Sequence, residues 1–260
     1  MTDAARGALA GKGIVVTRPL HQSDSLAARL HAAGARTIVF PTIAIGPPAD
    51  LPALAAVIDR LEQYDLAIFI SPNAAREAMR AITARRSWPA KVAVATIGRG
   101  GERELARHGL NDVIAPARFD SEGLLELPAL RAVAGKRIVI FRGDGGRELL
   151  AETLRARGAL VEYAACYQRS LPDADAAPLL AAWTRGEIDA VTVSSSEGLH
   201  NLQTLIGEAG RAYLSNTPLF VPHPRIERAA REGGLAHVHL TAQGDDGLFD
   251  GLCARFAAAG

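Results

Sequence analysis

Apolar and polar positions form the clearest pattern between residues 136 and 171. A short apolar run predicts a buried strand over residues 137–141, and apolar side chains at helical spacing predict an amphipathic helix over residues 147–156. A loop with three glycines separates the two, and a second strand is expected over residues 159–167. Backbone N–H groups in such a loop, directly before a helix, can bind an anion.

The same alternation of strand and helix runs along most of the chain. Ser23 is expected to cap a helix over residues 24–33, and a further helix is expected over residues 54–61. The other predicted strands cover residues 14–17, 36–40, 65–70, 91–97 and 112–115. Alternating strands and helices predict an α/β fold with parallel sheets covered on both faces.

The chain also repeats itself, which predicts two similar α/β domains. Residues 13–19 match residues 137–143, and residues 64–74 match residues 188–198. Residues 26–35 likewise match 150–159, and residues 112–125 resemble 237–249. Ligands of such sheets bind beyond the carboxyl ends of the strands. With two domains, we expect the site in the cleft between them.

Composition narrows the classes of partner. The 260 residues carry a net charge of +1, which argues against a nucleic-acid partner and against a polybasic membrane patch. The chain has two cysteines, so neither a disulfide framework nor a metal site is expected. No stretch is long enough for a membrane span, and the first residues do not read as a signal peptide. A cytoplasmic setting is therefore expected.

Polar clusters follow the predicted strands in phase with the repeat. Hydroxyls, glycines and helix N-termini bind anions with little net charge, so the pattern predicts a ligand with several negative groups. The candidate binding residues are Arg18, Ser71, Asn73, Gly98, Ser121, Arg142, Gly143, Asp144, Gly145, Gly146, Ser194, Ser195, Ser196 and His223.

Structural alternatives remain open for these residues. Ser71, Ser121 and Ser194 could be helix caps only, and the loop glycines could only supply turn geometry. Arg142 could belong to an ion-pair network with Asp144 and Arg147. Cys166 is expected to be a small core residue.

Two tyrosines, Tyr163 and Tyr167, lie toward the end of the strand that leads out of one domain. Tyr167 could face the cleft and offer its hydroxyl to a leaving oxygen. On pattern alone, a half-buried strand aromatic is the favoured interpretation.

Several motifs together resemble the uroporphyrinogen-III synthase family over residues 13–252. They are VTRP at 16–19, FP at 40–41, ISPNA at 70–74, DSEGLL at 120–125, RGDGGRELL at 142–150, YQR at 167–169 and the serines at 194–196. The resemblance implies two flavodoxin-like domains joined by a two-stranded linker. One would be discontinuous, with residues 1–40 and 172–260, and the other would be the inserted residues 41–171. It also implies a monomer without cofactor or metal.

The resemblance further implies a lyase reaction in tetrapyrrole biosynthesis. Its substrate would be the linear tetrapyrrole hydroxymethylbilane, which is cyclised to uroporphyrinogen III with inversion of ring D and loss of water. Tyr167 would be the acid that helps hydroxide to depart, and the polar loops would bind the carboxylates of the substrate. His223 stands where many members have a glycine, which makes the role of that loop an open question.

Two other classes remain as alternatives. The first is a non-enzymatic sensor that binds a small anion and closes on it. The second is a nucleotide- or flavin-using protein, although GRGG at 98–101 lacks the full dinucleotide fingerprint and no glycine loop is followed by a Walker lysine.

Overall fold

A computed structural model describes residue 7 and residues 9–145 and 148–257. Its strands and helices alternate along the chain, as the pattern predicts. The chain divides into two compact units: unit 1 is Met1–Ala44 with Ser170–Gly260, and unit 2 is Ile45–Arg169. Of the candidate binding residues, Gly146 lies outside the described residues.

Unit 1 is built on a five-stranded sheet with the spatial order β11-β10-β9-β1-β2. Its strands are β1 (Gly13–Val16), β2 (Arg36–Val39), β9 (Ala190–Thr192), β10 (Leu219–Val221) and β11 (Val238–Leu240). All neighbouring pairs are parallel. Numbered within the unit, the order is 2-1-3-4-5, which is the flavodoxin-like arrangement. The expected fold class is therefore confirmed for this unit.

Helices cover both faces of the unit 1 sheet. They are α1 (Leu20–Ala32), α8 (Ala177–Thr184), α9 (Ser196–Asn216), α10 (Pro224–Glu232) and α11 (Gly244–Ala257). Ile14 and Val16 pack in the cluster that contains Leu248 from α11, whereas Val15 packs in the cluster that contains Leu202 from α9. The alternation of side chains along β1 thus supplies two separate apolar faces.

The start of α1 differs from the prediction, because Ser23 does not cap it. The helix begins at Leu20 after Pro19, and Ser23 lies fully buried inside its first turns. The Ser23 hydroxyl donates to the carbonyl oxygens of Arg18 and Pro19, the backward bond that serines make inside helices.

Unit 2 contains a six-stranded sheet with the order β3-β8-β7-β4-β5-β6. Its strands are β3 (Ala44–Gly46), β4 (Leu66–Phe69), β5 (Ala93–Thr96), β6 (Val113–Ile114), β7 (Arg137–Gly143) and β8 (Leu160–Ser170). The pairs from β8 to β6 are parallel. If β7 is counted first, as its sequence match to β1 indicates, the order is again 2-1-3-4-5. In this numbering β4 is strand 3, so along the chain strands 3, 4 and 5 (β4, β5 and β6) come before strands 1 and 2 (β7 and β8).

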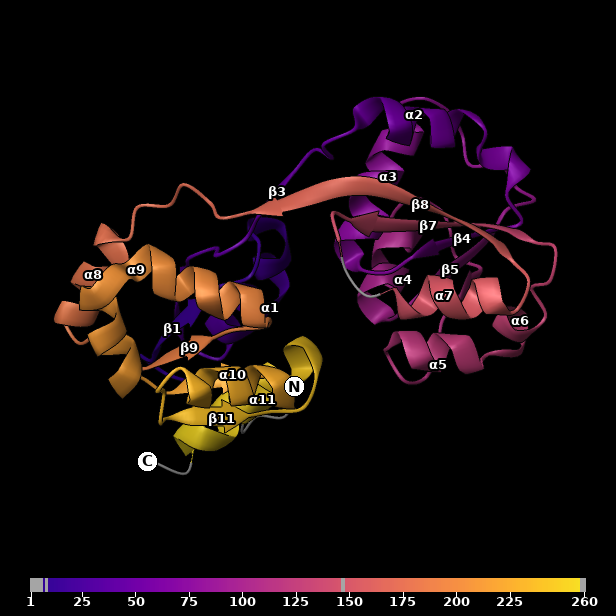
Figure 1. Ribbon diagram of the computed structural model, residues 1–260. Helices are drawn as coiled ribbons and strands as arrows, with labels where there is room; N and C mark the ends of the chain where they lie inside the picture. Colours follow the sequence, from indigo (N-terminus) through magenta and orange to yellow (C-terminus); the bar gives the residue numbers. More distant parts are fainter. Residues whose placement is uncertain (1–6, 8, 146–147, 258–260) are drawn as a thin grey trace. The chain divides into compact units, whose positions relative to one another are not determined.

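Helices lie on both sides of the unit 2 sheet, with α2 and α3 on one side and α5 and α7 on the other (Figure 1). The helices are α2 (Leu51–Asp59), α3 (Pro72–Thr83), α4 (Arg99–Ala106), α5 (Ser121–Glu126), α6 (Pro128–Arg131) and α7 (Leu149–Ala156), with a 3-10 turn at Leu61–Gln63. Val139 and Phe141 pack in the cluster with Met79 of α3, whereas Ile140 packs in the cluster with Leu154 of α7.

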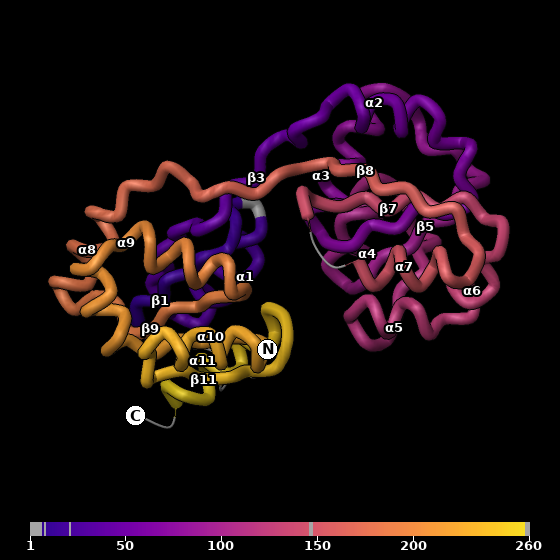
Figure 2. Tube along the Cα trace, in the orientation of Figure 1, coloured from indigo at the N-terminus to yellow at the C-terminus, as the bar shows by residue number. Residues whose placement is uncertain are grey.

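The chain passes between the units at residues 44–45 and 169–170. The two crossings run side by side, since β3 is the neighbour of β8 in the sheet (Figure 2). Within the described residues, no helix combines the length and apolarity that a membrane crossing requires. The same residues contain no group of three or more His, Cys, Asp or Glu side chains that could hold a metal ion.

Candidate functional site

A β-bulge in β8, opposite the carboxyl end of β7, sets the geometry of the candidate site in unit 2. Arg142 pairs with Ala165, but the next residue, Gly143, pairs with Tyr167, so Cys166 is the extra residue of β8. A bulge places two successive side chains on the same face of a strand. Cys166 and Tyr167 therefore both lie in the core under α3, whereas Tyr163 lies on the opposite face.

Tyr167 is buried, with 6% of its surface exposed. Its hydroxyl lies 3.3 Å from the Ser71 hydroxyl, and its ring lies so close to Gly143 that an added Cβ would be 2.8 Å from it. Burial raises the pKa of the Tyr167 phenol. The group therefore keeps its proton at neutral pH and is a hydrogen-bond donor, as a general acid must be.

Ser71 serves both as a helix cap and as the neighbour of Tyr167. Its Oγ accepts a hydrogen bond of 3.0 Å from the Ala74 N–H, and Pro72 occupies the first helical position. Asn73, in the same turn, is 9% exposed. The start of α3 thus positions the Ser71 hydroxyl beside the phenol.

Gly98 begins α4 with extended backbone and no capping side chain. A Cβ at Gly98 would lie 3.3 Å from the Phe119 side chain, so a larger residue here would require the ring to shift slightly. The guanidinium of Arg99 lies 5.7 Å from the centre of the same ring.

Arg142 forms an ion pair with Glu148. The network that the sequence suggested for Arg142, Asp144 and Arg147 stays a prediction, because Arg147 lies outside the described residues. Arg142 Nη1 lies 2.9 Å from Glu148 Oε1, and Arg142 Nε donates to the carbonyl oxygen of Gly145. Asp144 accepts a hydrogen bond from the Arg169 N–H, at 3.1 Å. Gly145 has a φ of +90°, a conformation that favours glycine.

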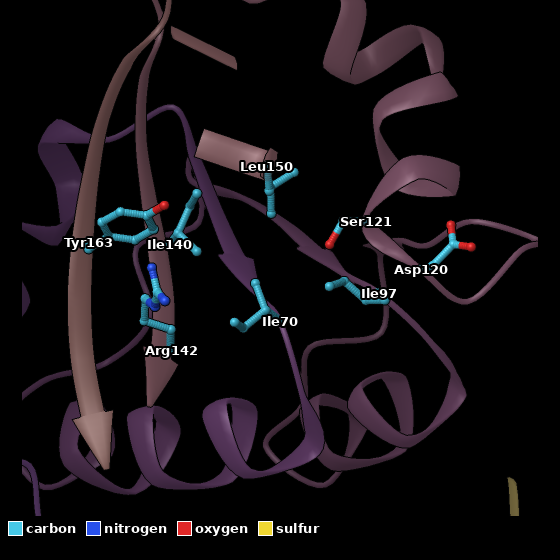
Figure 3. Close-up of a pocket in the computed structure, with 8 residues that line it drawn as sticks. All are labelled: Ile70, Ile97, Asp120, Ser121, Ile140, Arg142, Leu150 and Tyr163. Carbon is cyan, nitrogen blue, oxygen red and sulfur yellow. The ribbon is translucent and has the colours of Figure 1, made fainter. Parts of the chain in front are cut away.

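Arg142 also lines a pocket at the carboxyl edge of the unit 2 sheet (Figure 3). The pocket residues Ile140 and Leu150 belong to the core cluster on the face opposite to that of Tyr167. The lining residues are Ile70, Ile97, Asp120, Ser121, Ile140, Arg142, Leu150 and Tyr163. The pocket has a volume of about 230 Å³. Tyr163 covers the guanidinium of Arg142, with its ring centre 4.4 Å away, and its hydroxyl donates to Glu148 at 2.6 Å.

Two of the serines considered as caps are not caps. The α5 helix is capped by Asp120, which accepts from the Gly123 N–H at 2.6 Å, and Ser121 is the first residue of the helix. The α9 helix is capped by Ser195, which accepts from the Gly198 N–H at 2.9 Å. Asp120 precedes Ser121 by one residue, and Ser195 follows Ser194 by one residue. The apolar residues that each helix buries in the core decide where the helix begins, and so which side chain caps it.

Of the other predicted residues of unit 1, Arg18 and His223 have partners within the protein, and the Ser196 hydroxyl has none among the residues that the structure describes. Arg18 forms an ion pair with Asp245 in the first turn of α11. His223 caps α10, since its Nδ1 accepts from the Arg225 N–H at 3.1 Å. Ser196 Oγ is buried and makes no hydrogen bond within the described residues.

Comparison with known proteins shows which family this arrangement belongs to. The model of the family described as "Uroporphyrinogen-III synthase HemD" matches residues 24–248. The chain is 36% identical to the uroporphyrinogen-III synthase of Escherichia coli K12 over 236 residues, which is 90% of this chain and 96% of that protein. It is equally similar to the Salmonella typhimurium LT2 enzyme, at 36% over 238 residues. The chain belongs to the uroporphyrinogen-III synthase family.

Solved structures of uroporphyrinogen-III synthases share the fold. A crystal structure of a mutant of the Thermus thermophilus protein superposes with a TM-score of 0.58 at 20% identity, covering 95% of this chain and 99% of that one. The Helicobacter pylori 26695 protein gives 0.57 at 12% identity, with the same coverage. The family and the two-domain α/β fold predicted from the motifs are therefore confirmed.

Sequence reasoning missed two features of this uroporphyrinogen-III synthase family member. Glu148, which anchors Arg142 and Tyr163, was not among the candidates, although an acid six residues after Arg142 at a helix start is a detectable signal. The bulge at Cys166 was also missed. Without it, strict alternation would place Tyr163 and Tyr167 on the same face.

Proposed function

We propose that the chain cyclises hydroxymethylbilane to uroporphyrinogen III, with inversion of ring D and loss of water. The observation that carries the proposal is the 36% identity to the E. coli uroporphyrinogen-III synthase across 90% of this chain and 96% of that protein. Similarity of that extent includes both units, so the relatedness is not limited to one shared module.

Tyr167 is proposed as the acid that protonates the departing hydroxide. Its hydroxyl is next to Ser71 at the carboxyl edge of the unit 2 sheet, and burial keeps the phenol in its proton-bearing form. The bond from the Ala74 N–H holds the Ser71 hydroxyl in place beside the phenol. The pyrrole nitrogens of the substrate can supply the electrons that expel the hydroxide, so the proposal includes no cofactor and no metal.

Most of the rate is proposed to come from holding the linear substrate in the shape that closes. Main-chain N–H groups and hydroxyls at the strand ends would bind its carboxylates, with Asn73, Gly98, Ser121, Arg142 to Gly145 and Ser194 to Ser196 as the predicted contacts. Arg18 and His223 remain predicted contacts, and each already has a partner within the protein: Arg18 Nη1 pairs with Asp245, and His223 Nδ1 accepts from the Arg225 N–H. The expected monomer and the cytoplasmic setting also stay predictions.

The deciding experiment supplies hydroxymethylbilane to the purified chain and identifies the ring isomer formed. Uncatalysed closure gives uroporphyrinogen I, so we expect uroporphyrinogen III in the presence of the chain. Formation of isomer I at the uncatalysed rate would contradict the proposal. If the substrate binds tightly under those conditions without turnover, the alternative of an anion sensor is favoured instead.

A further inference from the structure

We propose that the pocket beside Arg142 holds the carboxylate end of one short alkyl arm of the substrate. This inference rests on the proposed function, because it takes the ligand to be a side arm of the linear tetrapyrrole. In this proposal the carboxylate of the arm accepts a hydrogen bond from Arg142. The alkyl stem of the arm packs against the surrounding isoleucines and Leu150. The pocket lies entirely within unit 2.

The guanidinium of Arg142 is buried and held on three sides. The residue is 5% exposed, its Nε donates to Gly145 O at 3.2 Å, and its Nη1 donates to Glu148 at 2.9 Å. The ring of Tyr163 covers one face of the group. Nη2 is buried and has no hydrogen-bond partner within the described part of the chain. Buried donors in proteins nearly always have an acceptor, so an acceptor on a ligand would complete this group.

The acidic groups around the pocket do not compete for Nη2. Glu148 already accepts from both Arg142 and Tyr163, and these bonds lower the pKa of its carboxyl, with the Tyr163 bond as the larger cause. Asp120 accepts from Arg118 Nε at 2.9 Å and from the Gly123 N–H. Both carboxylates therefore already accept hydrogen bonds from other groups. The positive charge of Arg155, 5.4 Å from the centre of the Tyr163 ring, further favours an anion near the pocket.

The shape of the pocket selects a side arm and excludes a ring system. Its volume of about 230 Å³ is below the roughly 300–1,000 Å³ of sites for drug-sized ligands. Its walls are mainly apolar, with Ile70, Ile97 and Leu150 between Arg142 on one side and Ser121 on the other (Figure 3). An alkyl stem ending in a carboxylate matches this combination of apolar walls and one charged donor.

The test is a titration of the full-length chain with propionate, followed through the ¹⁵N NMR signals of the Arg142 guanidinium. We expect a saturable shift at millimolar propionate, and we expect propionate to raise the KM for hydroxymethylbilane. Propionamide has the same shape without the charge, and its affinity should be lower by about 10-fold or more, the scale of one charge-assisted hydrogen bond. Equal binding of the two compounds, or an unsaturable shift, overturns the inference.

Two variants of one residue separate pocket filling from the loss of a hydroxyl. Ser121→Leu fills the pocket, so we expect loss of the propionate shift and a KM raised by about 10-fold or more, with isomer III still the product. Ser121→Ala leaves the space open, so its propionate shift should remain saturable and its KM should rise less than that of Ser121→Leu. A folded Ser121→Leu chain with unchanged shift and KM overturns the inference. If that variant does not fold, the titration of the wild-type chain decides.

Failure of this inference is distinguishable from failure of the proposed function. Isomer III formation together with no response of Arg142 to propionate overturns the inference alone. A wild-type chain that forms no isomer III overturns the proposed function, and with it the assignment of the ligand to a tetrapyrrole arm.

Discussion

At the scale of single residues, the contact between Gly143 and Tyr167 decides where the phenol lies. The bulge turns Tyr167 toward α3, and the absence of a side chain at Gly143 leaves room for the ring beside the strand. Ser71 then meets the hydroxyl at 3.3 Å. The position of the proposed acid thus depends on a backbone irregularity and a glycine, the first directly beside it in β8 and the second on the neighbouring strand.

Replacing Gly143 by alanine should disturb this contact and destabilise the fold. The new methyl would lie 2.8 Å from the Tyr167 ring, and overpacking of this kind costs about 1–3 kcal/mol. Urea unfolding of Gly143→Ala measures the loss. Gly46→Ala is the matched control, because its methyl would lie 3.8 Å from Gln168 Cγ, an ordinary contact. Equal stability of the two variants would contradict the packing argument.

Removing the Tyr167 hydroxyl should slow turnover without unfolding the protein. Tyr167→Phe keeps the ring in its core position, so we expect kcat to fall by about 10–100-fold with KM nearly unchanged, at or below the usual effect of one general acid. Steady-state kinetics and a thermal melt check the two parts. Turnover equal to that of the wild type would remove the acid role from Tyr167.

The ion pair of Glu148 should make stability sensitive to acid. Hydrogen bonds from Tyr163 and then Arg142 lower the pKa of the Glu148 carboxyl below its ordinary value of 4.5. Because the folded pKa is the lower one, this contribution is fully present above pH 4.5 and is lost as the pH falls through the folded pKa. Between about pH 5 and 3, Glu148→Gln should therefore lose less stability than the wild type. Parallel stability curves for the two proteins would contradict this.

At the scale of elements, the helix starts show what the sequence could and could not predict. The repeating order of strands and helices followed from apolar runs and periodicity, and each strand predicted by its residue range is present. The helix starts were predicted less well: α1 begins before Ser23, and Asp120 and Ser195 cap α5 and α9. Where several hydroxyl and acidic side chains are adjacent, each could cap the helix. Which one does so depends on how the apolar face of the helix packs in the core, and the local sequence does not report this.

The α9 cap gives a direct test of that choice. Ser195→Ala removes the acceptor for the Gly198 N–H and should lower stability by about 0.5–2 kcal/mol. Ser194→Ala, one residue earlier, should change stability by less than about 0.5 kcal/mol. Denaturant unfolding compares the two. A larger effect at Ser194 would show that the cap is assigned to the wrong serine.

At the scale of the whole molecule, the sequence repeat corresponds to one strand order used twice. Residues 13–19 and 137–143, which match in sequence, form the strands β1 and β7 in equivalent sheet positions. The repeat alone did not show that the chain enters unit 2 at a different strand. The bulge at Cys166 also escaped prediction, since it depends on pairing between strands, which no local pattern reports.

We propose that the protein acts mainly by positioning its substrate, with Tyr167 assisting the departure of hydroxide. The most direct test measures the isomer composition formed from hydroxymethylbilane by Tyr167→Phe at rising enzyme concentration. We predict that the fraction of uroporphyrinogen III rises to the wild-type level once the slower enzyme outpaces uncatalysed closure. A product that remains uroporphyrinogen I at enzyme concentrations that bind all the substrate would show that positioning without the Tyr167 hydroxyl does not direct ring closure.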